Sequence, residues 1–99
     1  MTEAQFTQRV IDAARLYSWL VTHFRPARTE RGWRTPLQGD SGFPDLVLAR
    51  RGVVLVPELK VGHNKPRPDQ VSWGVALGGC YRLWYPEDWP AIVEELRNQ

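Results

Sequence analysis

Residues 44–60 of this 99-residue chain read PDLVLARRGVVLVPELK, and they decide the fold. Two apolar, β-branched runs flank the dipeptide Arg51-Gly52, which is the pattern of a β-hairpin. If this dipeptide is a two-residue turn, the numbers of facing residues sum to 103, so Asp45 faces Glu58. Because side chains alternate along a strand, Asp45, Glu58 and Lys60 then share one face at the open end of the hairpin.

Two features of the hairpin leave its register open. Arginine is uncommon in the left-handed conformation that such a turn needs, and a three-residue loop with a bulge at Gly52 is the alternative. A slip by one residue places Pro57 opposite Asp45. Proline has no N–H to donate to a neighbouring strand, so Pro57 indicates a bulge or an unpaired side near the two acids.

The paired acids predict a cation site. Directly opposed residues have Cβ atoms roughly 4.5–5.5 Å apart, and two carboxylates near a protein surface repel each other by about 4 kcal/mol at 4 Å. Lys60 offsets part of this repulsion, and a divalent cation offsets it better. Since the ligands are oxygens, Mg²⁺ or Mn²⁺ is the cation that the pattern favours. The alternative is a surface ion pair between Glu58 and Lys60, with Asp45 ending a loop.

Helices and further strands are expected around the hairpin. Thr2 and Gln5 have the spacing of a capping box, and apolar residues at helical spacing follow them. Pro68 suits the start of a helix that Gly78-Gly79 stops, and Asp88 is the expected N-cap of a last helix. We expect helices over residues 3–17, 68–77 and beyond 88, strands over 19–24, 44–50, 53–61 and 81–85, and no regular structure over 25–43.

This order of elements predicts an α/β fold: a mixed central sheet with an antiparallel hairpin at its centre and helices on its faces. Residues 1–99 have room for one core and are expected to form a single domain. An apolar share of 42% and a charged share of 24% exclude a disordered chain or a coiled coil. No apolar run approaches the roughly 20 residues of a membrane helix. With no signal-peptide pattern and one cysteine, a cytoplasmic protein is expected.

Cationic side chains gather in the first two thirds of the chain. Residues 1–70 hold eleven Lys or Arg against seven acids. Arg25, Arg28, Arg31 and Arg34 recur at every third position, and such a cluster suits the phosphate backbone of a nucleic acid. A solvated loop is the alternative interpretation.

Three motifs carry a resemblance to a known family. They are Gly42-Phe43-Pro44-Asp45, Glu58-Leu59-Lys60 and Pro68-Asp69-Gln70. In this order they resemble the PD-(D/E)XK nuclease superfamily, and more closely its stand-alone VRR-NUC domains from phages and bacteria. The likeness covers most of the chain, whereas residues 25–41 depart from the pattern of the family.

The resemblance implies a restriction endonuclease-like αβββαβ core with an extra C-terminal helix, a Mg²⁺ or Mn²⁺ cofactor and hydrolysis of phosphodiester bonds. In such a site the two acids and a backbone carbonyl hold the metal, and the lysine positions the attacking water. The implied catalytic residues are Asp45, Glu58, Lys60, Gln70 and Glu3, and the implied metal ligands are Asp45, Glu58, the backbone carbonyl of Leu59, and Glu3.

Small stand-alone relatives are associated with cleavage of branched DNA, including Holliday junctions, as homodimers. The protein is therefore expected to be a metal-dependent DNA endonuclease that prefers branched DNA. It is expected to form a homodimer, because a four-way junction has two-fold symmetry. A non-cleaving nucleic-acid-binding module and a protein-interaction domain are the alternatives. The candidate nucleic-acid contacts are Arg25, Arg28, Arg31, Arg34, Lys65 and Arg67.

Overall fold

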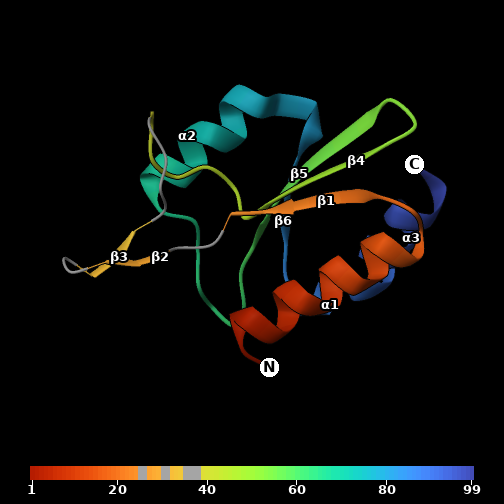
Figure 1. Cartoon of the computed structure of the whole chain (residues 1–99), viewed down its shortest axis with the longest axis horizontal. Helices are drawn as coiled ribbons and strands as arrows, with labels where there is room; N and C mark the ends of the chain where they lie inside the picture. Colours follow the sequence, from red (N-terminus) through yellow and green to blue (C-terminus); the bar gives the residue numbers. More distant parts are fainter. Residues whose placement is uncertain (25–26, 30–31, 35–38) are drawn as a thin grey trace.

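The hairpin quoted above forms the centre of a four-stranded sheet (Figure 1). The computed structural model describes residues 1–24, 27–29, 32–34 and 39–99. Strand β4 (Leu46–Arg50) pairs antiparallel with β5 (Val53–Leu59) and with β1 (Leu20–His23). Strand β6 (Tyr81–Trp84) runs parallel to β5. The sheet has the order β1-β4-β5-β6, and its one parallel pair among the described strands makes it mixed, as predicted.

The register of the hairpin is also as predicted. Arg51 and Gly52 both have positive φ, at 51° and 80°, as a two-residue type I′ turn requires. The alternative with a three-residue loop and a slipped register is therefore wrong. The pairing between the two strands stops before Pro57, in agreement with the unpaired side expected there. The paired residues are Leu48 and Leu55, Ala49 and Val54, and Arg50 and Val53.

In the described ranges three α-helices lie around the sheet. They are α1 (Glu3–Leu16), α2 (Pro68–Leu77) and α3 (Trp89–Asn98). The predicted capping box of α1 is confirmed, because Thr2 Oγ1 accepts from the N–H of Gln5 and Gln5 Oε1 accepts from the N–H of Thr2. Helix α2 ends at Gly78, whose φ of 63° is left-handed. Two short 3₁₀ turns, η1 (Gly78–Cys80) and η2 (Pro86–Asp88), flank β6.

The expectation that the side chain of Asp88 caps α3 is wrong. Asp88 occupies the N-cap position of that helix but makes no capping hydrogen bond there. Its Oδ2 instead accepts from the N–H of Tyr85 at 2.9 Å, which closes the preceding 3₁₀ turn. The carboxylate of Asp88 therefore stabilises the turn that begins at Pro86 and is not available to cap α3.

The apolar core lies between one face of the sheet and the pair α1 and α3, and α2 lies on the other side (Figure 1). Helix α2 contacts β6 closely, since a Cβ at Gly74 would lie 2.9 Å from the ring of Tyr81. In the described part of the chain, no helix is long and apolar enough to cross a membrane. The largest fully buried apolar side chains of the core are Phe6, Val10, Leu46, Leu48, Leu55, Leu59, Ile92 and Leu96.

A second, two-stranded sheet occupies part of residues 25–43. Strands β2 (Ala27–Thr29) and β3 (Gly32–Arg34) pair antiparallel and are not part of the main sheet (Figure 1). The expectation of no regular structure is therefore wrong for these six residues. Strands of three residues are too short for an alternating pattern to reveal them in the sequence.

Candidate active site

The open end of the β4–β5 hairpin brings the predicted aspartate and glutamate together. Asp45 directly precedes β4, and its Oδ2 accepts a hydrogen bond from the backbone N–H of Leu59 at 2.8 Å. The backbone carbonyl of Asp45 accepts from the N–H of Phe24 at 3.1 Å, so the neighbouring chain after β1 fixes its position. The Asp45 side chain thus reaches across to the residue that follows Glu58.

The Glu58 carboxylate is buried without a donor. Glu58 is 1% exposed, and neither of its carboxylate oxygens has a hydrogen-bond partner among the described residues. Burial, and after it the closeness of the Asp45 carboxyl, raises the pKa of Glu58 to about 9, while the ammonium of Lys60 opposes the rise. A buried carboxylate without donors is costly in its ionised form, so this position favours a proton or a bound cation.

Lys60 is buried beside these acids without an ion pair. It is 8% exposed, and no carboxylate of the described residues lies within ion-pair distance of its Nζ. Its backbone N–H donates to the carbonyl of Trp84 at 3.0 Å, so the contact with β6 continues one residue beyond β5. The alternative of a surface ion pair between Glu58 and Lys60 is therefore wrong.

Glu3, the first residue of α1, lies within electrostatic reach of the same cluster. Partial burial raises the pKa of Glu3, and the Asp45 carboxylate adds to the rise. The charges of Lys60 and Arg67 act in the opposite direction. Glu3 thus senses the charges of this cluster, and its role at the site stays a prediction.

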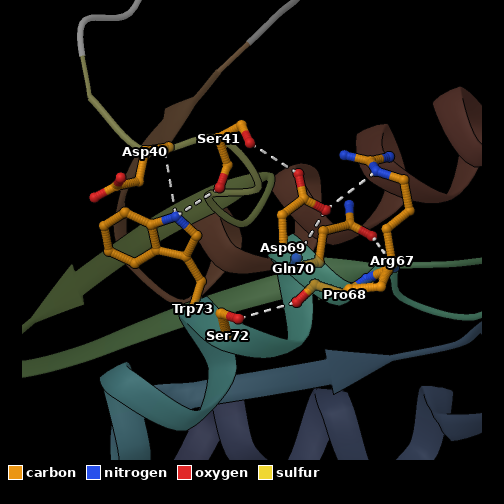
Figure 2. Close-up of polar contacts among 8 residues, drawn as sticks. All are labelled: Asp40, Ser41, Arg67, Pro68, Asp69, Gln70, Ser72 and Trp73. Atoms are coloured by element: carbon orange, nitrogen blue, oxygen red, sulfur yellow. Dashed lines mark hydrogen bonds and ion pairs between the residues drawn. The ribbon is translucent and has the colours of Figure 1, made fainter.

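Gln70 is buried at the start of α2 and fixes the loop that follows β5. Its Oε1 accepts from the backbone N–H of Arg67 at 2.8 Å (Figure 2). The carbonyl of Arg67 in turn accepts from the N–H of Val71 at 2.9 Å. These two bonds tie the end of the loop to the first turn of the helix. The contact observed for Gln70 is thus with the loop that leads away from Lys60.

An aromatic row that the sequence did not reveal packs around Phe43, which precedes Asp45 by two residues. The rings of Phe24 and Phe43 meet edge-on at 5.4 Å, and those of Phe43 and Trp73 at 4.8 Å. Trp73 Nε1 donates to the carbonyl of Ser41 at 3.0 Å (Figure 2). The row joins the end of β1, the chain before β4 and helix α2. Its members are far apart in the sequence, and Phe43 in the first motif is the one signal that pointed to it.

The predicted nucleic-acid contacts fall into three groups. Two arginines lie outside the described residues, and two lie in the short hairpin, where the backbone places them in β2 and β3. The other two follow β5 in an exposed loop, and one of these, Arg67, forms an ion pair with Asp69. In that order the groups are Arg25 and Arg31; Arg28 and Arg34; and Lys65 and Arg67.

The donor set suits a hard cation that keeps part of its water shell. Two carboxylates, of Asp45 and Glu58, and the carbonyl of Leu59 are the candidate ligands, and the buried Glu58 oxygens have no donor to displace. Mg²⁺ is bound by few protein oxygens together with water and substrate phosphates. Across the described ranges, no group of three or more His, Cys, Asp or Glu side chains is placed to hold a metal, so Glu3 as a further ligand stays a prediction.

Comparisons with known proteins add no family assignment. No protein-family model matches the chain, and a search of curated proteins finds no similar sequence. What the site does is therefore inferred from the burial, contacts and charge of its residues.

Proposed function

We propose that this protein is a metal-dependent DNA endonuclease whose active site is the open end of the β4–β5 hairpin. The observation that carries the proposal is the Glu58 carboxylate, buried without a donor next to Asp45 and within electrostatic reach of the buried ammonium of Lys60. A protein-interaction domain has no need of two acids and a lysine gathered and buried in this way. A site for a divalent cation and a phosphate does.

The arrangement of elements supports the same proposal. With the short β2–β3 hairpin set aside, the chain runs α1, β1, β4, β5, α2, β6, α3 around a mixed sheet. This is the order of the restriction endonuclease-like core that the motifs imply, followed by a further helix. The proposal therefore includes membership of the PD-(D/E)XK superfamily and, within it, likeness to VRR-NUC domains.

The residues divide the chemistry between them. Asp45, Glu58 and the Leu59 carbonyl would hold Mg²⁺ or Mn²⁺, which when bound polarises phosphoryl oxygens and lowers the pKa of its water. The Lys60 ammonium orients the attacking water and offsets the charge that develops on the phosphoryl group. Burial strengthens this effect, because a charge acts more strongly where water is excluded.

Branched DNA and a homodimer are part of the proposal. A four-way junction has two-fold symmetry, and two symmetric cuts need two active sites. Light scattering after size exclusion measures the mass, and we expect twice 11.4 kDa. A mass of 11.4 kDa at all concentrations, with paired cuts still made, would contradict the dimer.

Cleavage of labelled four-way junctions and matched linear duplexes tests the enzyme. The wild-type protein is expected to cleave the junction in Mg²⁺ or Mn²⁺ and to stop in EDTA, and Lys60→Ala is expected to remove cleavage. Glu87→Gln, a change at an exposed acid outside the cluster, is the control and keeps full activity. Binding without cleavage in either metal would favour a non-cleaving module, and neither binding nor cleavage a protein-interaction domain.

A further inference from the structure

Asp69 joins three separate parts of the chain beside the candidate active site. Its Oδ2 accepts from Ser41 Oγ at 3.1 Å, and its Oδ1 accepts from the backbone N–H of Gln70 at 3.0 Å (Figure 2). The same Oδ1 lies 3.3 Å from Arg67 Nε. One carboxylate thus connects the chain before β4, the loop after β5 and the first turn of α2.

The guanidinium of Arg67 is paired through Nε and open at its two terminal nitrogens. Its Nε faces Asp69, while no acceptor in the described part of the chain contacts its two terminal nitrogens. The side chain is 62% exposed, and its charge lowers the pKa of Glu3, so it lies near the cluster of acids. A guanidinium with two free terminal nitrogens can bind a phosphate through both of them.

We propose that Asp69 is a positioning residue, which orients Arg67 so that its two terminal nitrogens bind a backbone phosphate of the nucleic acid beside the active site. This inference rests on the proposed function and specifies how the substrate is held. Exposed arginines sample many rotamers, and an ion pair at Nε restricts them before the phosphate arrives. Asp69 therefore contributes to binding although it never contacts the substrate.

The proposal and a simple charge effect predict opposite changes in DNA affinity when Asp69 is removed. Removing an acid from a surface that faces DNA strengthens binding if the acid acts through its field. Removing Asp69 weakens binding if it acts by orienting Arg67. Asp40 is the matched control. It is exposed, it lines a surface hollow of about 410 Å³ together with Asp69, and its side chain makes no hydrogen bond or ion pair with any described residue.

The experiment measures the affinity of the full-length protein for a labelled four-way junction in EDTA, at several salt concentrations. Asp69→Asn keeps one oxygen, which can still accept from the Gln70 N–H, and its amide group can donate to Ser41 Oγ, but the charge that faces Arg67 is lost. We expect it to weaken binding about two- to fivefold, the range for an exposed ion pair. Asp40→Asn is expected to leave the affinity unchanged or to raise it.

Arg67→Ala completes the design. It is expected to weaken binding and to lower the salt slope by about one, as the loss of one phosphate contact predicts. In the Arg67→Ala background, Asp69→Asn is expected to add nothing, whereas a merely structural defect persists there. Ser41→Ala removes the hydrogen bond from Ser41 to Asp69, leaves the pair with Arg67, and is expected to keep the wild-type salt slope.

The outcomes separate this inference from the proposed function. If the wild type binds the junction and Asp69→Asn behaves like Asp40→Asn, the inference fails alone. If the weakening by Asp69→Asn persists without Arg67, the inference also fails. If the wild type neither binds nor cleaves DNA, the proposed function fails and takes the inference with it.

Discussion

Glu58 is the residue whose environment is hardest to explain without a ligand. The fold buries its carboxylate and gives it no donor within the described chain. An ionised carboxylate in such a position costs several kcal/mol unless an opposite charge compensates it. In the absence of a cation, the cost appears as a pKa of about 9.

Stability without metal should therefore depend on pH through Glu58. Its pKa is raised in the folded state from 4.5, so the folded state binds this proton more tightly than the unfolded chain does. The contribution is fully present below pH 4.5 and is lost as the pH rises through about 9. Urea unfolding in EDTA is expected to show stability falling across this window. Glu58→Gln is expected to remove most of the fall, and equal pH profiles for both proteins would contradict the assignment.

Gly42 is a second residue on which the site depends. Its φ is 92°, and a Cβ there would lie 2.6 Å from the backbone carbon of Asp69. Gly42→Ala is expected to destabilise the protein by about 2 kcal/mol or more, through left-handed strain and this clash, and to reduce cleavage because Asp45 follows closely. Gly39 also has a positive φ, but a Cβ there would meet nothing within 4 Å. Gly39→Ala should therefore lower the unfolding free energy by only about 1 kcal/mol. Equal losses of unfolding free energy would exclude the close contact.

At the scale of elements, Arg50 at the end of β4 connects the ends of two helices. Its guanidinium donates to the carbonyls of Tyr17 at 2.8 Å, Arg97 at 3.2 Å and Gln99, and it lies 4.9 Å from the ring centre of Trp19. The C-terminal ends of α1 and α3 are thereby joined to the central hairpin.

Replacement of this arginine should affect stability and leave the chemistry intact. Lysine cannot present several planar donors to three carbonyls, so Arg50→Lys is expected to cost about 1–2 kcal/mol of unfolding free energy. Cleavage per folded molecule is expected to stay at the wild-type level. Arg51→Lys, at the neighbouring turn position, is the control and should cost less than about 0.5 kcal/mol. A loss of activity beyond the loss of folded protein would contradict a structural role.

Elements with local signals were predictable, and those that depend on distant contacts were not. The hairpin register follows from the turn at Arg51 and the alternation of its strands, and it brought Asp45 and Glu58 together. The aromatic row and the hydrogen bond from Ser41 to Asp69 join residues about twenty to thirty positions apart, so no local pattern could indicate them. The β2–β3 hairpin is too short to be periodic, and the carboxylate of Asp88 serves a turn that competes with the expected cap.

At the scale of the whole molecule, charge is distributed unevenly. The net charge is +2, and the excess lies in residues 1–70. Nucleic-acid binding releases counterions, so each phosphate contact adds about 0.9 to the salt slope on duplex DNA. If the arginines between β1 and β4 contact the phosphate backbone of the DNA, their charges determine much of this salt slope.

Reversing one of these charges tests their part in binding. Arg28→Glu is expected to weaken junction binding and to lower the salt slope by about one or more. Arg97→Glu changes the net charge equally, but at an exposed position in the last turn of α3. It should leave the slope nearly unchanged. Equal effects from both reversals, measured by fluorescence anisotropy, would remove Arg28 from the interface.

The most direct test of the proposed site is to measure cleavage and binding of one labelled four-way junction by wild-type protein and by Glu58→Gln, in Mg²⁺ and in EDTA. We expect the wild type to cleave in Mg²⁺ and not in EDTA, and Glu58→Gln to lose at least about a hundredfold in rate while its affinity for the junction stays within about threefold. Cleavage by Glu58→Gln at the wild-type rate, or intact binding by a wild type that never cleaves, would contradict the assignment of these carboxylates to a nuclease centre.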